Sequence, residues 1–202
     1  TKSAFFHFMM VSMGHLGAVA AASHKVAMNV AELTWNISMG IASAAAIRTG
    51  QAQGRHDVCG VKRAAGVSIA FGAALMGTFG IVLMLFPVQI AAFWTSDARV
   101  VAQVAMLLPI VGAFQVFDST QTIAAGVLRG LLDTKGLLLA SLVGNWLIGA
   151  PCSFMFSRYF GFEAAGVWWG MVVGLASVSS LLLLRVLWRV RRKGAMHWTS
   201  EV

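Results

Sequence analysis

One aspartate of this chain lies in the middle of a long apolar stretch, where an ionised carboxylate is costly. Asp118 interrupts the run from Val100 to Leu128, and a charged aspartate at the centre of a membrane helix costs about 2.5–3.5 kcal/mol on insertion scales. Helical spacing places Gln115, Gln121 and Thr122 on the same face, where their dipoles would lower this cost. The pattern favours a carboxylate that exchanges a proton or another cation at a cavity. The alternative is an aspartate that pairs with a basic side chain of another helix for packing.

A second polar stripe lies in an earlier apolar stretch, between positions 26 and 47. Its members are spaced by three or four residues and therefore share one face of a helix. They are Asn29, Glu32, Asn36, Gly40 and Ser43. A ligand-facing surface fits this stripe, and Asn29, Glu32 and Asn36 are therefore candidate cavity residues. A seam of hydrogen bonds to a neighbouring helix fits it equally well.

Pro109 lies in the same stretch as Asp118, about two and a half turns before it. A proline inside a helix removes one backbone hydrogen bond, so a kink is expected there and Pro109 is a candidate hinge. No spacing in the chain fits a nucleophile with its base, a zinc site or a phosphate-binding loop. The sequence therefore predicts a protein that is not an enzyme and that carries no metal or organic cofactor.

The composition places these residues in a membrane protein. Of the 202 residues, 58% are hydrophobic and 11% are charged, whereas an ordinary soluble domain has about 25% charged residues. So few charges cannot cover the surface of a soluble globule, and disordered chains are poor in apolar residues. The long unbroken apolar runs also do not fit the short alternating segments of a membrane β-barrel. A polytopic α-helical membrane protein remains.

Apolar runs long enough to cross a bilayer, which takes about 20 residues, occur six times. They span residues 3–22, 26–47, 64–93, 100–128, 136–157 and 164–187. We therefore expect an all-α membrane fold, with a six-helix transmembrane lobe over residues 1–190 and a basic tail over residues 191–202. Four glycines of the third run are expected to let neighbouring helices approach closely. They are Gly66, Gly72, Gly77 and Gly80.

Basic residues alternate between the two ends of these helices. The link at 48–63, the link at 129–135 and the region from 185 onward are rich in lysine and arginine, whereas the two intervening links hold only Arg99 and Arg158. This pattern follows the positive-inside rule and predicts that the rich segments and the C-terminus are cytoplasmic. It also accounts for the net charge of +8 without a nucleic-acid partner. We expect a multi-pass protein of the cell (inner) membrane, with the lipid bilayer as its main partner.

Four segments carry motifs in a fixed order. Ala-Ser-His-Lys-Val-Ala-Met-Asn occupies 22–29, and Ile-Arg-Thr-Gly-Gln-Ala-Gln-Gly occupies 47–54. Phe-Gln-Val-Phe-Asp-Ser-Thr-Gln follows at 114–121, and Gly-Val-Leu-Arg-Gly-Leu-Leu-Asp-Thr-Lys at 126–135. In order and spacing these segments resemble the C-terminal half of the multidrug and toxic compound extrusion (MATE) family, and the resemblance covers nearly the whole chain.

The resemblance implies one six-helix lobe of a twelve-helix transporter, with its first helix truncated and the N-terminal lobe as a missing partner. Members export cationic or amphipathic small molecules by alternating access, driven by inward movement of protons or sodium. Asp118 matches an acidic residue that some relatives use for cation coupling, and Gln115 and Gln121 match polar positions around it. The resemblance thus makes Asp118 the cation-coupling residue. Gln115, Gln121, Thr122 and Phe114 become candidate cavity residues beside it.

The chain also departs from the family pattern. Phe114 stands where some relatives have tyrosine, so a hydroxyl ligand for sodium is absent, and Leu132 replaces a glycine. Lys25 replaces a glutamine and Ser38 replaces a helix proline.

Two alternatives to a multidrug antiporter remain open. A flippase for lipid-linked oligosaccharides belongs to the same superfamily, but such proteins tend to have basic cavities, and the stretch around Asp118 is acidic and polar. A membrane scaffold subunit that does not transport would use Asp118 for docking instead.

Overall fold

The computed structural model describes residues 18–158 and 163–197, and the regular structure among them is helical. The elements are α2 (Ala18–Gly54), α3 (Val58–Leu85), α4 (Pro87–Trp94), α5 (Ala98–Gly130), α6 (Thr134–Leu142), the π-helix η1 (Val143–Gly149), α7 (Ala150–Arg158) and α8 (Glu163–His197). Within these ranges, 5 helical segments are long and apolar enough to cross a membrane. The predicted all-α membrane fold is confirmed. Of the first expected span, 3–22, residues 3–17 lie outside the described part of the chain, and residues 18–22 belong to α2.

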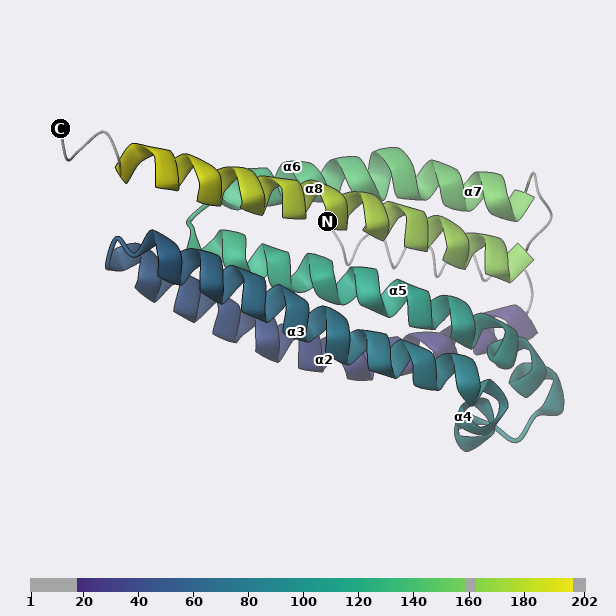
Figure 1. The fold of residues 1–202 in the computed structure, drawn as a ribbon. Coiled ribbons are helices and arrows are strands. Elements are labelled where there is room, and N and C mark those ends of the chain that lie inside the picture. Colours follow the sequence, from purple (N-terminus) through teal and green to yellow (C-terminus); the bar gives the residue numbers. More distant parts are fainter. Residues whose placement is uncertain (1–17, 159–162, 198–202) are drawn as a thin grey trace.

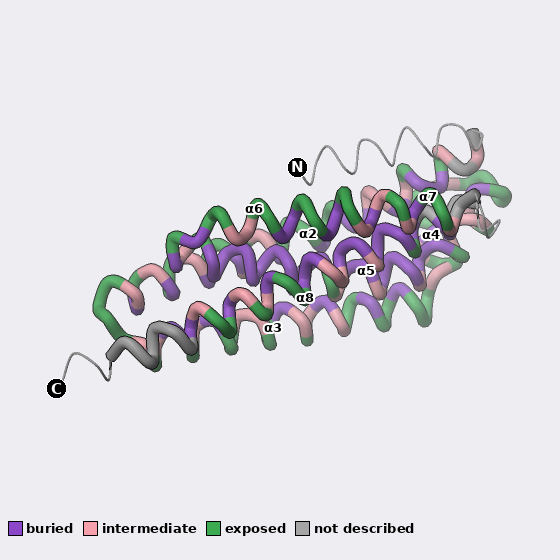
Figure 2. The backbone as a smooth tube through the Cα atoms, turned by 90° about the horizontal axis from the view of Figure 1, so that it is seen from above, coloured by how far each residue is buried: buried purple, intermediate pink, exposed green. Residues whose placement is uncertain are grey.

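Helix α5 is the centre of the bundle. Figure 1 shows α2 and α3 on one side of α5, and α8 with α6 and α7 on the other, and α5 packs directly against α2, α3 and α8. Half of its membrane-spanning window is buried (50%), against 22% for α3, a contrast that Figure 2 shows along the two helices. The side chains of α5 are therefore positioned by neighbours on both sides, whereas α3 keeps much of its surface outward.

Glycines bring α3 and α5 into direct backbone contact. A Cβ added to Gly80 would lie 2.9 Å from the carbonyl oxygen of Gly112, and one added to Gly112 would lie 2.8 Å from that of Gly80. Neither position has room for a side chain, so this pair sets the spacing of the two helices. Of the four glycines expected to pack, Gly72 and Gly80 face α5, but Gly66 and Gly77 have open space at the Cβ position.

The expected span over 64–93 is divided at Pro87. Helix α3 begins at Val58 and ends at Leu85, and α4 starts at Pro87. A proline has no N–H for a helical hydrogen bond and disfavours helical backbone at the residue before it. Phe86 accordingly has φ −124° and ψ 44°. Hydropathy alone does not predict this boundary, because the apolar run continues across it.

The expected span over 136–157 contains the π-helix η1. Pro151 follows η1 by two residues and cannot donate to the carbonyl four residues earlier, where its ring would also clash in a regular α-helix. A π segment widens the turn and takes up this mismatch. Pro151 is therefore accommodated by a local change in helix type.

Two helix ends also differ from the expected spans. Residues 18–25 are part of α2, so the break expected between the spans 3–22 and 26–47 is absent from the described residues. Helix α8 runs to His197, so residues 191–197 of the expected tail continue the last helix. Apolar runs mark the part of a helix that lies in lipid, and helices extend beyond it wherever backbone hydrogen bonds continue.

The arginine- and lysine-rich segments meet at one end of the bundle, which we call the basic end. Figure 1 shows the α2–α3 turn, the α5–α6 turn and the C-terminal half of α8 there together. Asp133, in the α5–α6 turn, is buried and accepts hydrogen bonds from Nε of Arg185 at 2.8 Å and Nε of Arg189 at 2.6 Å. These hydrogen bonds hold the pKa of the Asp133 carboxyl well below its ordinary value. The ion pairs of Asp133 with Arg185 and Arg189 link α8 to the α5–α6 turn.

The two turns at the basic end share one geometry. Helix α5 ends with the Leu132 N–H donating to the Arg129 carbonyl at 3.0 Å and the Asp133 N–H donating to the Leu128 carbonyl at 2.9 Å, the bond pattern of a Schellman motif. Leu132 has φ 59°, and the corresponding residue after α2, His56, has φ 55°. This left-handed region suits glycine, which the resemblance places at 132.

We expect Leu132→Gly to raise the free energy of unfolding by about 0.5–1 kcal/mol. The relieved left-handed strain, about 1–2 kcal/mol, exceeds the added chain entropy of a glycine, about 0.5–1 kcal/mol. The Leu132 side chain is 85% exposed, so little packing is lost. The control is Leu138→Gly, an exposed leucine inside α6, which should lose about 1 kcal/mol. The free energy of unfolding of each purified variant is measured by denaturant titration. A Leu132→Gly protein that is no more stable than wild type contradicts this explanation of the turn.

We expect Asp133→Asn to lower the free energy of unfolding by about 1–2 kcal/mol at neutral pH. The charge-assisted hydrogen bonds from the two arginines are weakened, but both arginines keep water contact. Since the pKa of Asp133 is lowered in the folded protein, its stabilisation is present above the unfolded value of about 3.9 and is lost as pH falls through the folded value. The difference in Tm from wild type should therefore narrow on acidification below about pH 4.

The matched control is Asp97→Asn at the opposite end. Asp97 is an exposed N-cap whose carboxylate lies 3.6 Å from Nε of Arg99, and asparagine caps a helix equally well. At neutral pH this variant should melt close to wild type, because Asp97 is exposed and its cap is kept. A Tm difference for Asp133→Asn that widens as the pH falls would show that the carboxylate is not the source of the stability.

Candidate functional site

The candidate site lies on α5, which runs from Ala98 to Gly130. Asp97 caps its first turn by accepting the Arg99 N–H at 2.9 Å, and Arg129 lies in the last turn, where a cation is favoured by the helix dipole. Pro109 lies inside the helix and is half-buried. Its role as a hinge stays a prediction.

Asp118 is buried in the middle of this helix, with 5% of its surface exposed. Gln121, Thr122, Ala125 and Arg129 follow it at steps of three, four, seven and eleven residues, which keep to one face of an α-helix. The face that carries Asp118 therefore continues to the basic end.

A pocket of about 350 Å³ opens along this same face, between α2, α5 and α6. We call it the α5 pocket. Its lining residues are Trp35, Met39, Gln121, Thr122, Ala125, Arg129, Thr134, Leu137, Leu138 and Ser141. Gln121 is the lining residue of α5 farthest from the basic end, and Asp118 lies one turn deeper. The pocket thus reaches from the basic end to within about 4.5 Å, measured along the helix axis, of the level of the carboxylate.

Two glutamines flank Asp118 with unused hydrogen-bonding capacity. Gln115 and Gln121 are 3% and 5% exposed, and neither Nε2 of Gln115 nor Oε1 of Gln121 has a hydrogen-bond partner in the described part of the chain. The hydroxyl of Ser119 is in the same situation. Buried polar atoms are rarely left without a partner. This donor and acceptor capacity around Asp118 suits a bound ion, water or a polar group of a substrate.

Phe114 lies elsewhere than in the α5 pocket. Its ring packs edge-on against Trp168 of α8 at a centroid distance of 5.4 Å, and Trp168 in turn lies 5.5 Å from the ring of His24. All three side chains are buried. Phe114 therefore closes the Asp118 face with an aromatic cluster on the side away from the basic end.

The polar stripe of α2 faces outward and does not join the α5 pocket. Glu32 and Asn36 are exposed and Asn29 is half-buried. Nδ2 of Asn36 donates to the carbonyl of Glu32 in its own helix at 2.8 Å, and no hydrogen bond links the three side chains to another described helix. The interpretation as a seam within this lobe is therefore not supported by the residues the structure describes.

The structure adds residues to the site that the sequence did not single out. Trp35 and Met39 of α2 and Ser141 of α6 line the α5 pocket beside Gln121 and Thr122. Trp35 and Met39 are four residues apart and lie beside the polar stripe in sequence, so periodicity alone could not separate the two faces of α2. Asn145 of η1 is wholly buried, and its amide has no partner among the described residues.

No group of three or more His, Cys, Asp or Glu residues that could hold a metal ion occurs within residues 18–158 and 163–197. The described polar side chains next to Asp118 on α5 are amide and hydroxyl groups, those of Gln115, Ser119 and Gln121. Such a set suits a proton or a weakly bound monovalent cation better than a divalent metal, which takes several charged oxygen ligands.

The chain is similar in sequence to known transporters. The MatE family profile matches residues 1–155. A probable multidrug resistance protein NorM of Burkholderia pseudomallei is 35% identical over 96% of this chain and 42% of the relative. The corresponding protein of Rhizobium meliloti is 37% identical over 91% of this chain and 40% of the relative. This chain thus spans about two fifths of the length of these relatives.

The fold is also shared with solved transporter structures. The eukaryotic MATE transporter AtDTX14 superposes with a TM-score of 0.85 at 20% identity, over 94% of this chain and 44% of that protein. The inward-facing and outward-facing conformations of a MATE multidrug resistance transporter superpose with TM-scores of 0.79 and 0.81, at 21% and 20% identity, covering 97% and 96% of this chain and 44% and 42% of the solved chains. The family profile and these relatives agree, and the chain therefore belongs to the MATE family of multidrug efflux transporters.

Proposed function

We propose that this chain is the C-terminal lobe of a cation-coupled antiporter that exports cationic or amphipathic small molecules by alternating access. Asp118 is the coupling residue in this proposal, and the coupling ion is a proton or sodium. The observation that carries the proposal is the position of Asp118. It is buried on a face of α5 that also lines a pocket reaching the basic end.

The coupling follows from the cost of an ionised carboxylate in apolar surroundings. When Asp118 is ionised, its face of α5 is stable only where water or a positive charge can reach it. A proton or a cationic substrate each removes that cost, so the two compete for the same negative charge. Binding of one therefore favours release of the other, which is the requirement for exchange.

The α5 pocket supplies a route for the ion from the basic end. Hydroxyl and amide groups line its inner part, notably Gln121, Thr122 and Ser141. The aromatic cluster of Phe114, Trp168 and His24 lies on the other side of Asp118. This arrangement gives the carboxylate a polar approach from one side and an apolar seal on the other, as one of two alternating states requires.

The basic end lies in the cytoplasm in this proposal, and the protein is a multi-pass component of the cell (inner) membrane. The support is the gathering of three arginine- and lysine-rich segments at one end of the bundle. The outward polar stripe of Asn29, Glu32 and Asn36 then faces a substrate cavity shared with an N-terminal lobe. An exposed charged stripe on a membrane helix otherwise has no partner to offset its cost.

Transport by the protein expressed from its complete gene tests this function. With Asp118→Asn, ion-driven transport of a fluorescent cation by everted vesicles should fall by about 5- to 150-fold. This range corresponds to typical coupling free energies of about 1–3 kcal/mol. The control is Asp97→Asn, which removes a carboxylate outside the α5 pocket and outside the polar stripe of α2 and should export with the ion dependence of wild type. Export by Asp118→Asn that responds to the ion gradient as wild type does would remove Asp118 from the mechanism.

A further inference from the structure

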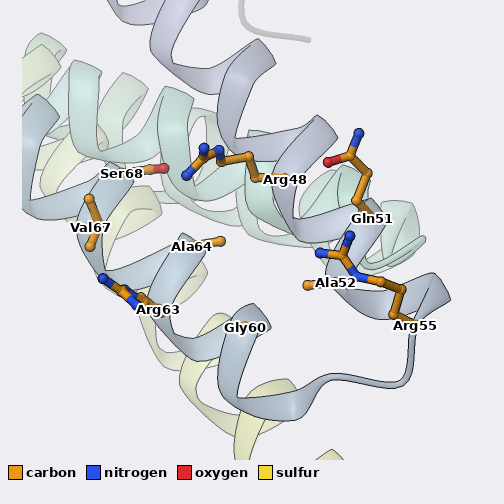
Figure 3. Close-up of a pocket in the computed structure, with 9 residues that line it drawn as sticks. All are labelled: Arg48, Gln51, Ala52, Arg55, Gly60, Arg63, Ala64, Val67 and Ser68. Atoms are coloured by element: carbon orange, nitrogen blue, oxygen red, sulfur yellow. The ribbon is translucent and has the colours of Figure 1, made fainter.

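A second pocket lies at the basic end between the last turns of α2 and the first turns of α3. We call it the arginine pocket; its volume is about 550 Å³. Figure 3 shows Arg48, Arg55 and Arg63 around it, with Gln51 and Ser68 at its margins. Ala52, Gly60, Ala64 and Val67 complete the lining. It shares no residue with the α5 pocket and contains none of the residues proposed for ion coupling.

The arginine pocket has positive charge that no acid among the described residues offsets. Among the described residues, no carboxylate lies within ion-pair distance of these three guanidinium groups. The acid nearest in sequence, Asp57, accepts the Gly60 N–H at 2.8 Å as the cap of α3. The N-terminus of α3 lies at the same place and adds the positive end of its dipole. This combination of guanidinium forks and amide and hydroxyl donors suits a phosphate group.

The surface next to the pocket suits a lipid rather than a soluble phosphate. Val67 lines the pocket, and Phe71 follows one turn farther into the membrane on the same face of α3. These side chains are 61% and 58% exposed, and α3 is the least buried of the described spans, at 22%. An acyl chain can lie along this apolar strip while its headgroup occupies the pocket at the level where headgroups lie.

We propose that the arginine pocket binds the phosphate headgroup of an anionic phospholipid of the leaflet at the basic end. Arg48 and Arg63 come from the two helices that flank the pocket, so the bound lipid joins the end of α2 to the start of α3. Basic pockets between transmembrane helices are a known form of anionic lipid recognition. This role is independent of ion coupling at Asp118.

Native mass spectrometry of the detergent-purified protein, expressed from its complete gene, tests the proposal. The probes are phosphatidylglycerol, phosphatidylcholine and inorganic phosphate. Wild type should retain phosphatidylglycerol in preference to phosphatidylcholine. Arg48→Gln with Arg63→Gln should weaken phosphatidylglycerol binding by about 30-fold, which corresponds to the usual contribution of two basic residues near anionic lipid. Equal retention of the two lipids by wild type overturns the proposal.

The charge-matched control is Lys62→Gln with Arg99→Gln. Lys62 lies beside Arg63 on α3 but does not line the pocket, and Arg99 lies at the opposite end. This variant loses the same net charge and should bind phosphatidylglycerol as wild type does. If both double variants lose phosphatidylglycerol binding equally, the effect comes from overall charge. That result would overturn the proposal that the arginine pocket is the lipid site.

Ala64→Phe provides a test that keeps every charge. Ala64 lies in the middle of the lining in Figure 3, and a phenyl ring there fills the cavity without removing an arginine. Phosphatidylglycerol binding should fall to the level of phosphatidylcholine, and binding at the wild-type level would contradict the proposal. Inorganic phosphate at the concentration of the lipid should leave the lipid complex intact. Displacement by inorganic phosphate would instead identify a soluble phosphate site and overturn the lipid assignment.

Discussion

A carboxylate placed inside an apolar lobe is the constraint on which this structure depends. Asp118 lies on α5, the helix at the centre of the bundle, at a depth where its ionised form is unfavourable. Close contacts such as that between Gly80 and Gly112 hold α5 tightly to its neighbours. Lipid is thereby excluded from the centre of the bundle, where Asp118 lies beside the polar side chains of Gln115, Ser119 and Gln121.

The two ends of the bundle differ in how they handle charge. At the basic end the carboxylate of Asp133 is held by Arg185 and Arg189, which fixes α8 to the turn between α5 and α6. The arginines of the arginine pocket have no such acid in the described structure. One basic cluster is thus satisfied within the protein and stabilises the fold, whereas the other keeps its charge available for a ligand.

The sequence predicted most of the fold and only part of the site. The all-α fold and the alternation of basic residues follow from hydropathy and charge, which act over whole helices. The break at Pro87 and the π-helix before Pro151 each depend on a single residue inside a continuous apolar run. Hydropathy therefore predicted neither of them. The position of Phe114 against Trp168, and the arginine pocket between α2 and α3, depend on which helices become neighbours. One chain's periodicity does not contain that information.

The central claim is that Asp118 exchanges its proton or cation for a cationic substrate. The most direct measurement is proton release on binding of tetraphenylphosphonium to the purified protein, followed by calorimetry in buffers of different ionisation enthalpy. If the coupling ion is a proton, the account predicts that wild type releases about one proton per bound cation. If the coupling ion is sodium, wild type should release sodium instead. The Asp118→Asn protein should release neither ion. The same release from both proteins would contradict it.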